Sequence, residues 1–154
     1  MPTIVCMTPD KLLISIIEDK DLEDLAALYG ELVNEKTDIV KLRDAYGRIG
    51  ASPEYIVLAA KVDGMLIGSL MGIVCTDLIA DCRPFMYIDN VIVKNGYRGI
   101  GVGGRLIQKI EETAKQRDCY ATIIISKSFR KEAHRFYEKL EYRRDVVQGY
   151  KKIF

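Results

Sequence analysis

The chain has 154 residues, of which 49% are hydrophobic and 29% charged, and its net charge is +1. It contains no run of 18 apolar residues, so a membrane span is not expected. A chain of this length can bury a core without disulfides or metals, and we expect residues 1–154 to form a single domain. The first residues lack the basic start and long apolar core of an export signal, so we expect a cytoplasmic protein.

The first half of the chain predicts a strand, two helices and a hairpin. An apolar run at 12–17 predicts a strand, and Asp21 is a suitable N-cap for a helix over 22–33, where leucines recur at helical spacing. Residues 37–50 predict a second, weaker helix. Two apolar runs joined by Asp63-Gly64 predict a hairpin over 55–74.

The second half continues the alternation of strands and helices. Residues 85–93 predict a strand, and an amphipathic helix follows over 103–118. Further elements are expected as a strand at 120–126, a helix at 131–140 and two short strands around Gln148-Gly149. The side chains of the amphipathic helix that should face the core are Leu106, Ile107, Ile110 and Ala114.

The cysteines carry no recognisable site. Cys6, Cys75, Cys82 and Cys119 are scattered without C-x-x-C spacing, and the chain has only one histidine, His134. This pattern indicates neither a zinc site nor a disulfide framework. We therefore expect reduced thiols and no metal.

Five glycines lie within residues 96–104, between a predicted strand and a predicted helix. Residues 99–104 match the G-x-G-x-x-G loop of dinucleotide-binding folds, but the next strand ends in Ser126-Lys127, where that fold needs an acidic residue. A P-loop would need a lysine and a hydroxyl residue where Arg105-Leu106 stand. Both interpretations are therefore disfavoured.

A third interpretation fits the same loop. Residues 98–103 read R-x-x-G-x-G, which resembles the R/Q-x-x-G-x-G/A signature of the GNAT superfamily of acetyl-CoA-dependent N-acetyltransferases. Residues 133–142 resemble that superfamily's A-x-x-F-Y-x-K-x-G-F/Y helix, and the two motifs stand in the right order. The resemblance covers nearly the whole chain. It implies a GNAT-like α/β (α+β) fold with a mixed, mostly antiparallel central sheet of about seven strands flanked by about four helices.

The resemblance also implies acetyl-CoA as cosubstrate. Amide groups at the start of a helix favour anions, and glycines let a diphosphate come close. In the family, the strand equivalent to Val91–Val93 splays from its neighbour and pairs through its main chain with the amide arm of coenzyme A. Arg130 stands where many members have an asparagine that contacts coenzyme A. The expected cofactor-binding residues are Val91, Ile92, Val93, Arg98, Gly99, Ile100, Gly101, Val102, Gly103, Gly104, Arg105 and Arg130.

Two residues are catalytic candidates. The resemblance makes Tyr137 the general acid that protonates the departing thiolate, and its structural alternative is a core aromatic beside Phe136. Asp89 interrupts an apolar strand, and two-residue alternation predicts that it faces the same side as Val91 and Val93. It resembles a carboxylate that some aminoglycoside-modifying members carry nine residues before the motif. Asp89 is expected to be a base acting through water, an anchor for the ammonium, or a hydrogen-bonded structural acid.

Two further features concern charge and a helix end. Residues 1–93 hold 8 basic and 15 acidic side chains, whereas residues 94–154 hold 15 and 7, a split of −7 and +8. This split indicates either two solvated faces or an anionic ligand on the C-terminal part and a cationic one on the N-terminal part. Glu141 replaces the family's glycine, and a left-handed conformation there would cost about 1 kcal/mol.

The sequence thus predicts an N-acetyltransferase that moves an acetyl group from acetyl-CoA to a primary amine of a small molecule. A protein lysine or N-terminal acetyltransferase is the alternative enzyme, and a non-catalytic acyl-CoA-binding sensor is the alternative from another class. We expect a small-molecule or peptide amine as partner, and neither nucleic acid nor membrane. The identity of the amine and a homodimeric state are left open.

Overall fold

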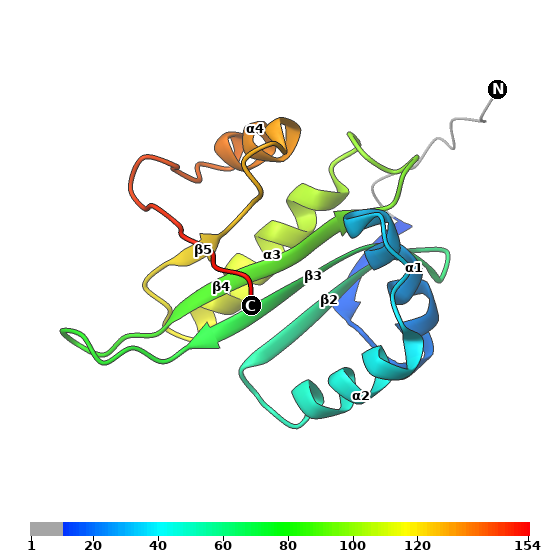
Figure 1. The fold of residues 1–154 in the computed structure, drawn as a ribbon, viewed down its shortest axis with the longest axis horizontal. Helices are drawn as coiled ribbons and strands as arrows, with labels where there is room; N and C mark the ends of the chain where they lie inside the picture. Colours follow the sequence, from blue (N-terminus) through cyan, green and yellow to red (C-terminus); the bar gives the residue numbers. More distant parts are fainter. Residues whose placement is uncertain (1–10) are drawn as a thin grey trace. The chain divides into compact units, whose positions relative to one another are not determined.

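The computed structural model describes residues 11–154 (Figure 1). In chain order the elements are β1 (Leu12–Ile16), a short 3-10 helix η2 (Asp19–Asp21), α1 (Leu22–Val33), α2 (Ile39–Gly50), β2 (Tyr55–Val62), β3 (Met65–Cys75), β4 (Phe85–Val93), α3 (Val102–Gln116), β5 (Thr122–Ile124) and α4 (Lys131–Lys139). They fall into two compact units, one running through Ile123 and the other covering Ile124–Phe154. A single domain over residues 1–154 stays a prediction.

The described residues form one sheet with the strand order β1-β2-β3-β4-β5. Neighbouring strands from β1 to β4 are antiparallel. The sheet has five strands within the described chain, so the prediction of about seven is wrong. The two strands expected around Gln148-Gly149 do not form there, because side chains such as Val147 and Tyr150 are exposed and find no apolar face to cover.

Helices cover both faces of the sheet in the first unit. On one face, Leu25 and Leu28 of α1 pack with Val57 and Ala59 of β2. On the other face, α3 comes so close to β3 that a Cβ placed on Gly72 would lie 2.7 Å from Cδ1 of Ile110. The inward positions predicted for α3 are all buried, which confirms that part of the prediction. No helix of the described part is long and apolar enough to cross a membrane.

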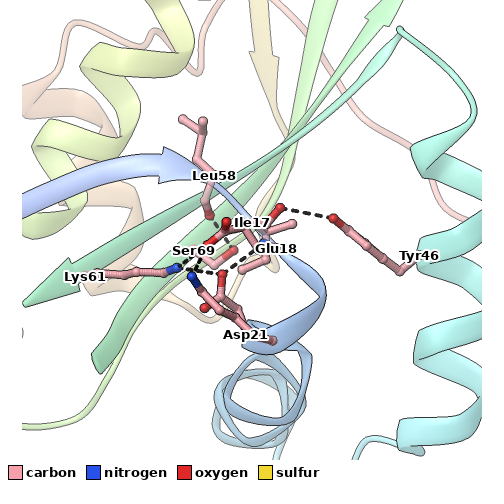
Figure 2. A network of polar contacts seen from close by, with 8 residues as sticks. Ile17, Glu18, Asp21, Tyr46, Leu58, Lys61 and Ser69 are labelled. Carbon is pink, nitrogen blue, oxygen red and sulfur yellow. Dashed lines mark hydrogen bonds and ion pairs between the residues drawn. The ribbon is translucent and has the colours of Figure 1, made fainter. Parts of the chain in front are cut away.

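The start of α1 is fixed by a buried ion pair and not by a helix cap. Asp21 occupies the N-cap position, as predicted, but its side chain makes no capping hydrogen bond to α1. Its carboxylate instead lies 2.7 Å from Nζ of Lys61 and accepts a hydrogen bond from the backbone N–H of Glu18 at 2.9 Å (Figure 2). Because Lys61 belongs to β2, this pair ties the first turn of α1 to the sheet.

Two further polar contacts in Figure 2 hold the neighbouring elements. The hydroxyl of Tyr46 in α2 donates to the carbonyl oxygen of Ile17 at 3.0 Å. Oγ of Ser69 in β3 donates to the carbonyl oxygen of Leu58 in β2 at 2.7 Å. Buried polar groups of this kind need such partners, and they fix α2 and the β2–β3 pair in one arrangement.

The second unit contains α4, which ends in a Schellman motif. The N–H groups of Glu141 and Tyr142 donate to the carbonyl oxygens of Glu138 and Tyr137 at 3.0 and 3.1 Å. Glu141 has φ +67°, the left-handed conformation considered from the sequence. The left-handed conformation of Glu141 is therefore less favourable in free energy than that of a glycine at this position.

Candidate active site

The glycine loop leads from β4 into α3 in a left-handed conformation. Gly99 and Gly101 have φ of +77° and +91°, which favour glycine. Gly101 is the N-cap of α3 and offers no side-chain acceptor to the first turn. A Cβ placed on Gly99, Gly101 or Gly104 would meet open space. The first N–H groups of α3 are thus accessible to an external acceptor.

The open loop is anchored on both sides. Val102 is 1% exposed, and its Cγ1 would lie 3.3 Å from a Cβ on Gly68 of β3. Nε of Arg98 donates to the carbonyl oxygen of Val93 at 2.9 Å. The N–H of Asn95 donates to the carboxylate of Glu31 in α1 at 3.1 Å. These contacts fix the loop before any ligand binds, while Ile100 and Arg105 remain exposed.

A β-bulge interrupts β4 next to Asp89. In the register of β3 and β4, Ser69 pairs with Ile92 and Met71 pairs with Asp89. Two residues, 90–91, therefore stand opposite a single residue of β3, which defines a bulge. Asn90 has φ +53°, so the bulge is formed by a left-handed residue.

The bulge changes which side of the sheet Asp89 faces. Residues that pair directly across two strands share a face, so Asp89 and Ile92 lie on the α1 side with their partners. Val93 pairs with Gly68, whose missing Cβ points at α3. The prediction that Asp89 faces the same side as Val93 is wrong, because it assumed unbroken alternation. Ile92 is buried in the core with α1.

The carboxylate of Asp89 is held by a backbone donor and lies near a second polar group. Its Oδ1 accepts a hydrogen bond from the backbone N–H of Asn90 at 2.8 Å. The hydroxyl of Tyr87, two residues earlier on the same face, lies close enough to interact with it. Burial, followed by the nearby Asp89 carboxylate, raises the pKa of Tyr87. The carboxylate is therefore fixed in position on the α1 side.

Tyr29 of α1 is a further candidate residue, near Asp89, that the sequence analysis did not name. Burial is the main cause that raises the pKa of Tyr29 to about 12, and the charge of Asp89 adds to it. The nearby polar side chains of Ser69 and Asn90 act in the opposite direction on this pKa. Tyr29 follows Leu25 by four residues, so helical spacing marks it as inward-facing, but only the bulge brings it to Asn90.

A pocket of about 260 Å³ opens beside Tyr29 and Asn90, between α1, α2 and the sheet. Its walls include Tyr29, Leu42, Tyr46, Met71 and Asn90. A larger hollow of about 480 Å³ lies along β1, and none of the predicted site residues lines it. The smaller pocket is therefore the one connected to the bulge.

Tyr137 lies in α4, in the second unit, within an aromatic cluster. Its ring centroid is 5.3 Å from that of Phe136 and 6.2 Å from that of Tyr142. The neighbouring His134 places Nε2 3.0 Å from the carbonyl oxygen of Lys127, which ties its ring to the segment before α4. Arg130 occupies the N-cap position of α4. Tyr137 thus has a packing role, and its catalytic role stays a prediction, as does the cofactor role of Arg130.

Residues 20–142 match the model of the acetyltransferase (GNAT) family. The chain belongs to the GNAT acetyltransferases. It is 26% identical over 132 residues to a glucosamine 6-phosphate N-acetyltransferase of Trypanosoma brucei brucei, covering 83% of this chain and 86% of that protein. It is 28% identical over 138 residues to glucosamine 6-phosphate N-acetyltransferase 1 of Dictyostelium discoideum, covering 83% and 84%.

The fold is similar to that of solved proteins over nearly its whole length. A crystal structure described as a transcriptional regulator from Bacillus halodurans C-125 superposes with a TM-score of 0.87 at 23% identity, covering 93% of this chain and 99% of that one. At this identity the likeness concerns the fold alone. It supports the GNAT-like α/β architecture of the sequence analysis, with the strand number corrected.

GNAT acetyltransferases take their acetyl group from acetyl-CoA, and the glycine loop of this GNAT chain suits the pyrophosphate of that molecule. The first turn of α3 has no side-chain cap, and the glycines leave the space that a diphosphate would need. Lys94, Arg98 and Arg105 add positive charge around the loop. Within the described residues, no group of three His, Cys, Asp or Glu could hold a metal ion.

Proposed function

We propose that this GNAT acetyltransferase transfers the acetyl group of acetyl-CoA to a primary amine of a small molecule. The observation that carries the proposal is the uncapped, open start of α3 after a glycine loop with two left-handed glycines. Backbone N–H groups at such a helix start bind phosphate oxygens. The loop residues 98–104 would hold the pyrophosphate, with Arg98 and Arg105 supplying charge.

The free edge of β4 supports a site for the amide arm of coenzyme A. β5 has three residues and β4 has nine, so β5 can pair with only part of that edge. The N–H of Met86, near the start of β4, donates to the carbonyl oxygen of Ala121 at 2.9 Å. Val91, Ile92 and Val93 lie at the other end of β4, where their backbone groups could pair with an amide ligand.

The reaction needs two proton transfers. The neutral amine attacks the thioester carbonyl carbon, the C–N bond forms, and the C–S bond breaks. The amine arrives as an ammonium and must lose a proton, and the departing thiolate must gain one. A phenol, with a reference pKa of about 10, can protonate a thiolate, whose thiol has a reference pKa of about 8.5. Tyr137 is proposed for this step.

Asp89 is proposed to act on the amine. A hydrogen bond from the Asn90 N–H holds its carboxylate in place, and the hydroxyl of Tyr87 lies close enough to interact with it. A fixed carboxylate suits the task of anchoring an ammonium group through a charge-assisted hydrogen bond. This arrangement supports the anchoring role over that of a direct base.

Glucosamine 6-phosphate is a second candidate for the acceptor. The two relatives described above are named for glucosamine 6-phosphate, which is itself a primary amine. Transfer to a protein lysine or N-terminus uses the same chemistry and is the third candidate. Two assays separate the three acceptor candidates. One measures thiol release from acetyl-CoA with a panel of amines, and the other uses mass spectrometry to find acetylation on proteins incubated with the enzyme and acetyl-CoA.

The role of Tyr137 is tested by Tyr137→Phe, which keeps the ring contacts with Phe136 and Tyr142 and removes only the hydroxyl. Turnover should fall by about 10²-fold or more, while the affinity for acetyl-CoA changes little. Tyr142→Phe is the matched control, since it removes a hydroxyl from the same cluster and should leave turnover unchanged. Equal turnover of the folded Tyr137→Phe variant and the wild type would reject the assignment.

The role of Asp89 is tested by Asp89→Asn in the same assay. The neutral amide anchors an ammonium poorly, so the KM for the amine should rise while acetyl-CoA binding stays intact. Asp81→Asn, at an exposed position, is the control and should behave as wild type. If Asp89→Asn folds and keeps the wild-type KM, Asp89 is a structural acid.

A further inference from the structure

The pocket between α1, α2 and the sheet has walls without any charged side chain. Ten residues line it, among them Leu42 and Ile49 of α2 and Met71 of β3. Its polar groups are the hydroxyls of three tyrosines and the amide of Asn90. α1 and α2 pack against each other (Figure 1), and side chains of both helices line the pocket.

This composition selects against anionic ligands. Moving a phosphate from water into a pocket without a cation would leave its charge unpaired, which is unfavourable. An apolar group, in contrast, gains free energy when it leaves water, and tyrosine rings offer faces for an aromatic ring. The pocket therefore suits an uncharged, apolar group.

The size of the pocket limits that group. A cavity of about 150 Å³ holds one benzene ring. The volume here is about 260 Å³. A single aromatic ring with a short chain, or a branched alkyl group, would fit, whereas two fused rings with substituents would not.

Three contacts connect the pocket with Asp89. Met71, in its wall, pairs directly with Asp89 across β3 and β4. Asn90, also in the wall, is the next residue and donates its N–H to the carboxylate. Tyr29 lies close enough to Asp89 to interact with its charge. An amine anchored at Asp89 would therefore direct its body toward the pocket.

We infer that the acceptor is a primary amine with an apolar body, an arylalkylamine or a branched alkylamine, whose body binds between Tyr29, Leu42 and Met71. This inference rests on the proposed acetyl transfer to an amine. It assigns the acceptor to a different chemical class from glucosamine 6-phosphate.

The test compares acceptors in a thiol-release assay with acetyl-CoA. The probes are phenethylamine, isopentylamine, glucosamine and glucosamine 6-phosphate. The ratio kcat/KM should be higher for phenethylamine or isopentylamine than for either sugar amine, by about tenfold or more. A higher ratio for a sugar amine overturns the inference and leaves the proposed function standing. If no amine releases thiol, the proposed function itself fails.

Matched variants locate the binding site. Ala45 of α2 is half-buried and lines the pocket, so Ala45→Phe places a ring in it. The KM for phenethylamine should rise by about tenfold or more, while acetyl-CoA binding stays unchanged. Ala27→Phe makes the same change at an exposed position of α1 and should have no effect. If Ala45→Phe does not fold, Leu42→Lys replaces it, since a cation in the pocket should also weaken binding. Unchanged KM in the folded pocket variant overturns the inference.

Discussion

At the scale of single residues, the bulge after Asp89 decides which side chains surround this carboxylate. The sequence marks it as an unusual acid in an apolar strand, and this part of the prediction needs no structure. Alternation also puts Tyr87, two residues earlier, on the same face, but Tyr29 could not be predicted as a neighbour, because the bulge at Asn90 shifts the register of β4 against β3. A bulge depends on pairing between strands, whereas alternation in one strand carries no information about its partner.

Tyr29 gives a prediction about pH. Its pKa is raised from 10.0 to about 12 in the folded protein. Below pH 10 both states hold the phenol proton, but between about pH 10 and 12 the unfolded chain loses it while the folded chain keeps it. The free energy of unfolding should therefore fall as pH rises through this window, and the fall should be shallower in Tyr29→Phe.

Urea unfolding of both proteins at about pH 9, 10 and 11 measures this difference. Tyr46 and Tyr87, whose pKa values are also raised, contribute equally to both proteins and cancel in the comparison. If the two curves of unfolding free energy against pH are parallel across the window, separated by a constant offset, the raised pKa of Tyr29 is contradicted.

At the scale of elements, close packing of α3 on β3 depends on Gly72. A Cβ there would lie 2.7 Å from Cδ1 and 2.9 Å from Cγ1 of Ile110. Gly72→Ala should therefore overpack the core and lower the free energy of unfolding by about 1–3 kcal/mol. Gly47→Ala is the matched control, because a Cβ on this α2 residue meets nothing within 4 Å.

The control should move in the opposite direction. Alanine in place of glycine inside a helix stabilises by about 0.5–1 kcal/mol. Chemical denaturation of the two variants beside wild type measures both effects. Equal stability of Gly72→Ala and wild type would mean that Ile110 moves aside without cost, and the close approach of α3 would not be a constraint.

The elements that the sequence predicted well are those whose own residues carry a full hydrophobic pattern or turn signal. The hairpin at Asp63-Gly64, the strand at 85–93 and the two helices α1 and α3 have bounds close to the predicted ones. β5 is shorter than predicted, and the C-terminal strands are absent from the described chain. Short strands need a neighbour to bond and an apolar face to cover, and neither can be read from a few apolar residues.

At the scale of the whole molecule, the charge split predicts how salt affects binding. Residues 94–154 carry a net charge of +8. If this charge meets the anionic cosubstrate, coenzyme A should lose affinity with rising salt more steeply than its dephosphorylated form, which lacks the 3′-phosphate. Calorimetric titration of both ligands over a salt series measures the two slopes. Equal slopes would favour two solvated faces instead.

The binding of acetyl-CoA at the glycine loop is tested most directly by thermal unfolding with ligand. Acetyl-CoA at about 100 times its Kd should stabilise the wild type by about 2.7 kcal/mol, and NAD should give no comparable shift. Gly104→Val fills open space beside the loop at a residue without left-handed φ, so it should fold and lose most of the shift. A melting curve that NAD moves and acetyl-CoA does not would contradict the account.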